Sequence, residues 1–305
     1  MRNTALKHVF CHRYGQPTDV MVQDWDNLLI LDACRYDLFR DYNTIAGELE
    51  SIVSVASTSL EFMEKTFDGR TFHDTVYVSA NGYSHQLADD IFHEFISTYP
   101  YSQRGLLNRA LYENYHPQTV RKHAEDAFNN HPDKRLIVHF MQPHGPYFGP
   151  MANKLRARLK SDHGIELSAW VTDTEVADRS DGPVYLMDAA EMGLITSEEL
   201  RDVYLENLEL VLGHVGQLLK KISGKTVITA DHGELLEHAT NVHSQLYSEQ
   251  FEHPGHVWVP ELRIVPWLEI ESGQRRKIVS EPPNKSERVD DELVEQHLKS
   301  LGYKQ

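Results

Sequence analysis

The chain has 305 residues, of which 40% are hydrophobic and 25% are charged. This composition is ordinary for a globular protein and excludes a disordered, collagen-like or coiled-coil chain. The 30 basic and 46 acidic residues give a formal net charge of −16. Such a chain repels phosphate backbones and anionic lipid surfaces, so we expect no nucleic-acid partner.

Only two cysteines occur, Cys11 and Cys34, so the sequence contains neither a disulfide framework nor a cysteine-based zinc motif. The first residues lack the basic start and apolar core of a signal peptide. No apolar run approaches the roughly 18–20 residues that span a bilayer. We therefore expect a cytoplasmic protein without a transmembrane segment. The 18 histidines are potential metal ligands and acid–base groups at neutral pH.

Short apolar runs alternate with amphipathic stretches, which predicts an α/β protein with a mostly parallel sheet. The longest predicted helix, Ser197–Ile222, has a regular apolar stripe, with Thr196 or Ser197 as its cap and Gly224 after its end. The predicted elements, in chain order, are strand Asn27–Ala33, helix Arg35–Asp41, strand Ser51–Ala56, helix Leu60–Phe67, strand Thr75–Ala80, helix Gln118–Asn130, strand Arg135–Met141, helix Ser197–Ile222, strand Lys225–Ala230, strand Val265–Ile270 and helix Asp290–Leu301.

Two stretches do not follow this alternation. Residues 150–195 are poor in periodicity, which is typical of an inserted lid or cap. Residues 271–289 are polar and contain two prolines, which predicts an exposed loop or linker. We therefore expect a single catalytic domain over residues 1–305, with a lid or cap insertion around 150–195 and a polar C-terminal extension from about 271.

Polar side chains follow nearly every predicted strand. Ligands of parallel α/β sheets bind beyond the carboxyl ends of the strands, so these side chains are the candidates for a site. They are Asp32 after the first strand, Ser57, Thr58 and Ser59 after the second, Asn81 after the third, Gln142 and His144 after the fourth, and Asp231 and His232 after the fifth.

The sequence TADHGE, residues 229–234, places Asp231 beside His232, and Gly233 permits a tight turn. Oxygen and nitrogen ligands of this kind can bind a divalent cation. A charged turn with a surface histidine is the alternative interpretation, and Asp32 has its own alternative as a helix cap. The joint occurrence of these groups at one sheet edge favours a metal site.

Three hydroxyl groups precede the helix that begins near Leu60. Thr58 and Glu61 have the spacing of a capping box, which would make this segment a simple helix start. A nucleophile at a helix N-terminus is the functional interpretation, because the helix dipole and free amides stabilise an anionic substrate there. The two interpretations are compatible, since one hydroxyl can cap the helix while its neighbour attacks.

Two further segments contain histidines near proline. In HFMQPHGPY, residues 139–147, prolines on both sides of His144 stiffen a turn that could aim its ring at an anionic oxygen or a leaving group. A purely structural turn is the alternative. In EHPGH, residues 252–256, either His253 or His256 could supply a late metal ligand, and His238 and His243 compete with them.

Taken in this order, Asp32, the hydroxyl–helix segment, HFMQPHGPY and DHGE resemble the alkaline phosphatase superfamily. More narrowly, they resemble its sulfatase-like branch, which includes proteins similar to the lipoteichoic acid synthase catalytic domain. The resemblance runs from about residue 24 to 270. It implies a three-layer α/β/α sandwich with a doubly wound sheet, and a metal-dependent enzyme that acts on phosphate or sulfate esters.

The resemblance also assigns roles to individual residues. It implies one or two divalent cations (Zn, Mn, Mg or Ca), with Ser59 as nucleophile and Thr58 as its rival. His144 matches the substrate-binding histidine of the group. The implied metal ligands are Asp32, Asp231, His232 and His253, and the implied substrate-binding residue is Asn81. Arg35 and His256 are further candidates for substrate binding.

The chain departs from the resemblance in two respects. It lacks the C/S-x-P/A-x-R motif of sulfatases that oxidise a cysteine or serine, and Cys34 stands two residues after Asp32 rather than at the nucleophile position. Gln142 occupies a place where many relatives have an aspartate.

The sequence therefore predicts a phosphate ester hydrolase or phosphotransferase with a covalent intermediate, acting on a small-molecule or a glycan- or lipid-linked ester. The alternatives are a sulfate ester hydrolase with an unmodified hydroxyl and a non-catalytic metal- or glycan-binding protein.

Overall fold

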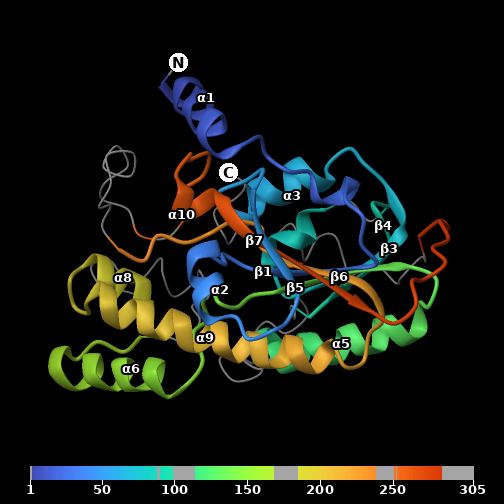
Figure 1. The fold of residues 1–305 in the computed structure, drawn as a ribbon. Helices are drawn as coiled ribbons and strands as arrows, with labels where there is room; N and C mark the ends of the chain where they lie inside the picture. The colour runs from blue at the N-terminus through green and yellow to red at the C-terminus, as the bar shows by residue number, and fades with distance from the viewer. Residues whose placement is uncertain are drawn as a thin grey trace.

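The structure is a computed structural model that describes residues 2–87, 90–98, 114–167, 185–237, 251 and 253–283. Within these residues, seven strands form one sheet in the order β2-β7-β6-β1-β5-β3-β4 (Figure 1). In chain order the strands are β1 Asn27–Leu31, β2 Glu48–Val53, β3 Phe72–Ser79, β4 Phe92–Ser97, β5 Arg135–Phe140, β6 Gly224–Thr229 and β7 Ile264–Ser272.

Helices of very different length connect these strands. The described residues contain α1 Arg2–Tyr14, α2 Tyr36–Tyr42, α3 Ser59–Phe67, α5 Pro117–Asn130, α6 Pro150–His163, α8 Leu186–Glu191, α9 Ser197–Leu218 and α10 Pro260–Arg263, with 3-10 turns η1 Val20–Val22 and η2 Gly82–Gln86. None of these helices is long and apolar enough to cross a membrane.

The sheet is parallel except for one strand. Strand β1 pairs in parallel with both β5 and β6, and β3 pairs in parallel with β5 and β4. Strand β7 runs antiparallel to both of its neighbours, β2 and β6. The expected mostly parallel sheet is therefore confirmed, and the carboxyl ends of β1, β5 and β6 lie together at one edge.

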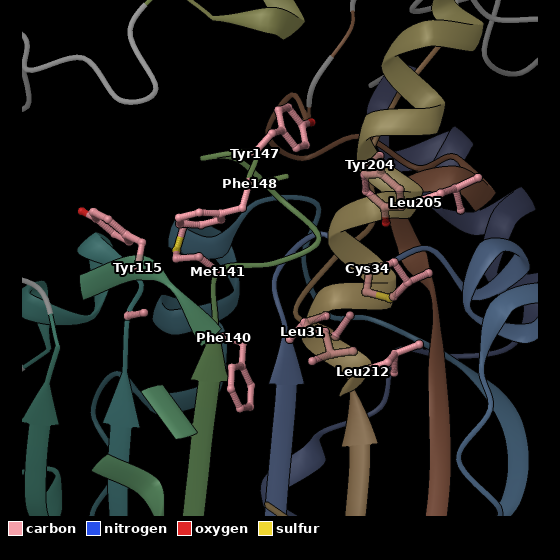
Figure 2. Packing of buried hydrophobic residues seen from close by; sticks show 14 of the residues in the cluster. Leu31, Cys34, Tyr115, Phe140, Met141, Tyr147, Phe148, Tyr204, Leu205 and Leu212 are labelled. Atoms are coloured by element: carbon pink, nitrogen blue, oxygen red, sulfur yellow. The ribbon is translucent and has the colours of Figure 1, made fainter. Parts of the chain in front are cut away.

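Strand β1 shows why helices cover both faces of the sheet. Its alternate residues point to opposite sides. Leu29 and Leu31 belong to the core that includes residues of α5 and α9, whereas Leu28 and Ile30 belong to the core formed with α3. A strand buried on both faces needs helices above and below it. The expected three-layer sandwich is confirmed, and Figure 2 shows the packing where α9 crosses the strand ends.

Helix α9 begins as the sequence predicts. The Thr196 hydroxyl accepts the Glu199 backbone N–H at 3.1 Å, and the Glu199 carboxylate accepts the Thr196 N–H at 2.9 Å. This reciprocal capping satisfies two amides that the helix itself leaves without partners. The regular helix ends at Leu218, four residues before the predicted end at Ile222.

Strand β2 lies three residues before its predicted position of 51–56. Only Val53 of its six residues is buried. This strand lies at the edge of the sheet and pairs with β7 alone among the described residues. Backbone pairing with β7 therefore sets its register, and the apolar pattern on which the prediction relied carries little information at such an edge.

Several elements escaped the sequence pattern. Helix α1, the edge strand β4 and helix α6 were not predicted, and α6 and α8 fall in the stretch 150–195. Leu155 and Leu159 of α6 are buried in the core that α9 also enters. The lid role of this stretch stays a prediction. The predicted helix Asp290–Leu301 lies outside the described residues.

After β7 the chain crosses the amino-terminal edge of the sheet. The Arg275 guanidinium contacts Asp24 at 2.7 Å and Asp26 at 2.5 Å. Further along, the Glu281 carboxylate contacts the Lys134 ammonium at 2.8 Å. These ion pairs tie residues 275–281, part of the predicted C-terminal extension, to the start of the sheet.

Candidate active site

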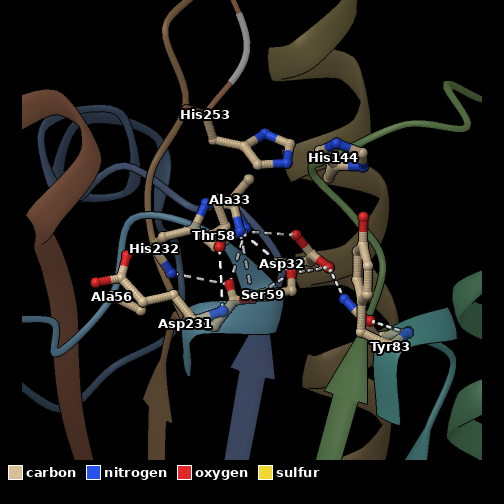
Figure 3. Close-up of polar contacts among 12 residues, drawn as sticks. Asp32, Ala33, Ala56, Thr58, Ser59, Tyr83, His144, Asp231, His232 and His253 are labelled. Atoms are coloured by element: carbon tan, nitrogen blue, oxygen red, sulfur yellow. Dashed lines mark hydrogen bonds and ion pairs between the residues drawn. The ribbon is translucent and has the colours of Figure 1, made fainter. Parts of the chain in front are cut away.

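The loops after β1, β5 and β6 bring the site together (Figure 3). Asp32 follows β1, and Asp231 and His232 follow β6; all three side chains are buried. The Asp32 backbone N–H donates to Phe140 at the end of β5, and the Asp32 carbonyl accepts the His144 N–H at 3.3 Å. The parallel pairing of β1 with both neighbours therefore places these loops side by side.

Ser59 lies at the centre of this group. It is the first residue of α3, and its Oγ is 2.7 Å from Asp231 Oδ2. The same oxygen is 3.3 Å from Asp32 Oδ2 and 3.2 Å from His232 Nε2. The four residues come from three separate segments of the chain, and the sequence analysis named all of them.

Thr58 has a different role in the structure. Its hydroxyl accepts the Glu61 backbone N–H at 3.1 Å, so Thr58 is the cap of α3. The Glu61 carboxylate turns away from Thr58 and accepts the Ser57 N–H and the Arg263 guanidinium. One hydroxyl caps the helix, and its neighbour Ser59 faces the carboxylates.

The ring of His232 is fixed by its backbone contact. Its Nδ1 is 2.8 Å from the Gly233 carbonyl oxygen, which can only accept a hydrogen bond. Nδ1 therefore carries the hydrogen, and the Nε2 lone pair points toward Ser59. Burial lowers the pKa of His232 to about 4 despite the opposing effect of Asp231. The ring is thus neutral and in the tautomer that a metal ligand requires.

Gly233 allows this turn to pack closely on α10. Its N–H donates to the Leu262 carbonyl at 2.9 Å. A Cβ atom at this position would lie 2.0 Å from the Glu261 carbonyl oxygen, which is far inside van der Waals contact. Any other residue would therefore displace Asp231 and His232, which explains the glycine of DHGE.

Asp32 and Asp231 are two buried carboxyl groups in contact with the same hydroxyl. Burial raises the pKa of Asp32 well above its usual value, and the nearby Asp231 charge raises it further. Burial would also raise the pKa of Asp231, but His232, His139 and the Ser59 hydrogen bond lower it overall. The pair therefore retains one proton more readily than two separate carboxylates would.

A second cluster lies beside the first. Glu234 Oε1 is 3.0 Å from His253 Nδ1, and Glu234 Oε2 is 3.8 Å from His144 Nε2. The rings of His253 and His232 are 4.6 Å apart between centroids, so the two clusters adjoin. His144 Nδ1 contacts the Gly145 carbonyl oxygen at 2.8 Å. Its Nε2 lone pair therefore faces a carboxylate oxygen, which is also an acceptor.

Both clusters have the composition of divalent-cation sites. Ser59 has one hydrogen but faces three acceptors, Asp32, Asp231 and His232. In the second cluster, Glu234 Oε2 has no hydrogen-bond partner among the described residues although it is fully buried. Facing acceptors without a hydrogen between them repel one another, and a cation would remove the repulsion. Carboxylate, imidazole and hydroxyl groups suit Zn²⁺ or Mn²⁺.

Three other predicted residues lie near the site with different contacts. The Asn81 amide donates to Asp32 Oδ2 at 2.6 Å. The Arg35 guanidinium pairs with Asp37 at 2.7 Å and also reaches the Glu234 backbone carbonyl. His256 contacts Glu61, and its side chain is 69% exposed. Asn81 thus touches a candidate ligand, whereas Arg35 and His256 contact residues that support the loops.

Sequence reasoning quoted two residues without giving them a role. Glu234 belongs to DHGE, and its place in the same turn as His232 could have indicated it. His139 begins HFMQPHGPY and lies on β5 with its side chain fully buried. Its Nε2 is 3.6 Å from Asp231 and 3.8 Å from Asp32. The period of two along β5 would have placed it on the α3 side of the sheet.

Comparison with known proteins gives distant structural similarity. No protein-family model matches the chain, and no curated protein matches it. Among solved structures, the chain is similar to BT1596, described as a 2-O GAG sulfatase, at 12% identity and a TM-score of 0.46, covering 82% of this chain and 64% of that one. This chain therefore spans less than two thirds of that sulfatase.

Two further structures are similar at comparable distance. One is the C-terminal periplasmic domain of EcEptC from Escherichia coli in complex with Zn, at 14% identity and a TM-score of 0.45, covering 84% of this chain and 77% of that one. The other is a protein in the alkaline phosphatase superfamily from Vibrio parahaemolyticus, at 11% identity and a TM-score of 0.45, covering 90% and 69%. The second of these is thus described as a member of the superfamily that the sequence motifs resemble.

Proposed function

We propose that the protein is a metal-dependent enzyme that hydrolyses or transfers phosphate esters, with Ser59 as the nucleophile. The observation that carries this proposal is the position of Ser59 Oγ, within 3.3 Å of Asp32, Asp231 and His232. A hydroxyl surrounded by potential metal ligands at the start of a helix is suited to attack an anionic ester.

The first cation would be held by Asp32, Asp231 and His232 together with the Ser59 oxygen. When bound, it would lower the pKa of the Ser59 hydroxyl and offset negative charge on the ester. Asn81 holds Asp32 through its amide, and the backbone N–H groups of Ala33 and His232 hold Asp231 Oδ1. These contacts fix the carboxylates before substrate arrives.

Ser59 would then attack the phosphorus atom in line with the bond that breaks. A Ser59–phosphorus bond forms as the ester oxygen leaves and takes a proton, which produces a phosphoserine. Water or an acceptor alcohol then attacks the phosphorus and frees Ser59. The amides at the start of α3 stabilise negative charge on the phosphoryl oxygens. Hydrolysis and transfer share this first step and differ only in the acceptor.

The second cluster supports a role beside the first cation site. His144, Glu234 and His253 present acceptors on adjoining side chains. Burial lowers the pKa of His144, so the ring is neutral at physiological pH. A neutral imidazole and a carboxylate suit a second divalent cation better than direct contact with an anionic phosphate. We infer that these residues hold such a cation when two are bound.

Cys34 is not placed to replace Ser59. Its sulfur is 4.0 Å from the Arg35 carbonyl oxygen, and burial raises the pKa of the thiol well above its usual value. Cys34 packs in the core beside Tyr204 and Leu31 rather than among the carboxylates (Figure 2). This position disfavours a sulfatase that uses an oxidised cysteine, and it leaves a phosphate ester as the preferred substrate.

The experiment compares turnover of p-nitrophenyl phosphate, bis-p-nitrophenyl phosphate and p-nitrophenyl sulfate by protein loaded with Zn²⁺ or Mn²⁺. We expect phosphate ester turnover that chelator and Asp231→Asn both abolish. The ratio of the monoester rate to the diester rate then distinguishes a small-molecule substrate from a glycan- or lipid-linked diester. Turnover of the sulfate alone, or cation binding without turnover of any ester, would contradict the proposal.

A further inference from the structure

His139 lies beneath the first cation cluster, in a position that the proposed chemistry does not use. It is on β5, opposite Ile30 of β1 and Ser79 of β3. Its side chain is fully buried, and its Nδ1 is 2.8 Å from the Tyr77 hydroxyl oxygen. The two rings are nearly parallel, with centroids 6.3 Å apart. A buried imidazole with one fixed partner has its other nitrogen aimed in a defined direction.

That other nitrogen points at the carboxylates. Nε2 is 3.6 Å from Asp231 Oδ2 and 3.8 Å from Asp32 Oδ2, which is too long for a full hydrogen bond. It has no hydrogen-bond partner among the described residues. Two buried carboxyl groups thus face it.

The hydroxyl of Tyr77 and Nδ1 of a neutral His139 can each donate or accept a hydrogen bond. Burial raises the pKa of Tyr77, so its hydroxyl keeps a hydrogen throughout the physiological range. The hydrogen bond between the two rings can therefore run in either direction, depending on which nitrogen of His139 carries its hydrogen.

Electrostatics select one direction. If Nδ1 carried the hydrogen, the Nε2 lone pair would face two carboxyl groups in a fully buried environment, where repulsion is poorly screened. If Tyr77 donates to Nδ1, Nε2 carries the hydrogen and directs its positive end at the same groups. The second arrangement is lower in energy. It is opposite to that of His232, whose Nε2 presents a lone pair.

We propose that His139 is a positioning residue, fixed by Tyr77 with its Nε2–H toward the carboxylates that bind the cation. The inference rests on the proposed cation site. His139 lies close enough to Asp32 and Asp231 to share a metal ion with them, but an Nε2 that carries a hydrogen has no lone pair for a metal, so in this arrangement His139 is not itself a ligand. It limits the repulsion between Asp32 and Asp231 and keeps both oriented, as partners of metal ligands do, and loss of such a partner typically weakens metal affinity by about 10–100-fold.

The first experiment compares two variants of similar size. In His139→Gln a side-chain amide can still direct an N–H at the carboxylates, whereas His139→Leu fills the space without a donor. Zn²⁺ affinity is measured by competition with a chromogenic chelator, and thermal stability by calorimetry of the metal-free proteins. We expect the leucine variant to bind Zn²⁺ about 10–100-fold more weakly and the glutamine variant to recover most of the loss. Equal affinity of all three proteins would overturn the proposal.

The second experiment observes the tautomer directly, without reference to activity. Nitrogen-15 spectra of histidine-labelled protein distinguish a protonated, an unprotonated and a metal-bound imidazole nitrogen. We expect His139 Nε2 to carry its hydrogen both without metal and with Zn²⁺ bound. A Zn²⁺-bound Nε2, or an Nδ1–H tautomer in the unaltered protein, would overturn the proposal.

These readouts separate the two proposals. If the unaltered protein binds no divalent cation, the proposed function fails and this inference fails with it. If the protein binds the cation and turns over esters but the leucine and glutamine variants lose affinity equally, only the positioning role fails. If both variants lose thermal stability, the nitrogen-15 spectra provide the decision, because they report the tautomer of His139 in the unaltered protein.

Discussion

Acidic side chains have different partners at the two edges of the sheet. At the amino-terminal edge, Arg275 pairs with Asp24 and Asp26. At the carboxyl-terminal edge, Asp32, Asp231 and Glu234 gather within one site. Among the described residues, no lysine or arginine side chain forms an ion pair with any of these three.

This difference separates carboxylates that have a cationic partner within the chain from carboxylates that lack one. A buried carboxylate with a cationic partner is part of the fold, and removing the partner is costly. Carboxylates that gather without a lysine or arginine partner repel one another until a cation is added. The amino-terminal edge is therefore complete as the chain folds, whereas in the proposed function the carboxyl-terminal edge gains its counter-charge from a bound cation.

The largest expected effect comes from the nucleophile. Ser59→Ala should lower phosphate ester turnover by at least about 1000-fold, because removal of a nucleophile eliminates the covalent step. Three candidate ligands remain, so the variant should still bind a divalent cation. The matched control is Thr58→Val, which removes a helix cap worth about 1 kcal/mol but keeps turnover. Loss of turnover in the threonine variant alone would assign the reaction to Thr58.

The second largest effect is expected at the carboxyl-terminal edge, where a change of Asp32 should alter cation affinity and thermal stability in opposite directions. Asp32→Asn should weaken Zn²⁺ binding by more than about 100-fold, which exceeds the loss usual for a residue that only supports a ligand. The same change should raise the melting temperature of the metal-free protein, because it removes one of two like charges. Calorimetry in the presence of chelator measures the second effect. A lower melting temperature would contradict the view that these carboxylates repel one another.

The gain in melting temperature of metal-free Asp32→Asn should change with pH in a definite direction. The pKa of Asp32 is raised in the folded protein by burial and by Asp231. A raised pKa contributes stability that is fully present below the unfolded value of about 3.9 and is lost as the pH rises through the folded value. The difference in melting temperature between Asp32→Asn and the unaltered metal-free protein should therefore be small in acid and widen toward neutral pH.

The opposite result is expected at the amino-terminal edge. Asp26 is buried and accepts the Lys225 N–H at 2.8 Å in addition to its contact with Arg275. Asp26→Ala should lower the free energy of unfolding by about 2 kcal/mol, because it leaves a buried donor without a partner. Turnover per folded molecule should be unchanged, as measured by active-site titration. A loss of kcat would show that the two edges are coupled.

The smallest effect concerns Asp24, which is largely exposed. A hydrogen bond from Arg275 lowers its pKa, and burial opposes part of the change. A lowered pKa contributes stability above the unfolded value that is lost as the pH falls through the folded one. Asp24→Asn should therefore reduce the melting temperature slightly at neutral pH and not at all in strong acid. Surface charge pairs contribute little, so a large change at neutral pH would implicate Asp26 instead.

The sequence predicts the sheet well where strands are buried on both faces. Strands β1, β5 and β6 read as continuous apolar runs, and the residues after them form the site. Strands β2 and β4 lie at the edges, where exposure removes the apolar signal and pairing alone sets the register. The same limit explains α1, whose sequence has no regular apolar stripe.

The candidate site was predictable in its members but not in its contacts. Chain order and motif place Asp32, Asp231 and His232 at one edge, but the choice between Thr58 and Ser59 depends on which hydroxyl turns inward. That choice is set by the first turn of α3. Likewise, the amino-acid sequence does not show that Glu234 Oε2 is buried with no hydrogen-bond partner among the described residues. Such facts come from packing between segments about 200 residues apart.

Strand β7 has a consequence for how the chain acquires this arrangement during synthesis. It inserts between β2 and β6, both of which precede it in sequence. Until residues 264–272 leave the ribosome, β2 has no neighbour in the described sheet and β6 exposes one unpaired side. Unpaired strands recruit other chains. Nascent forms that stop before β7 should therefore need chaperone protection, and arrest of translation just before this strand should produce the species most prone to aggregate.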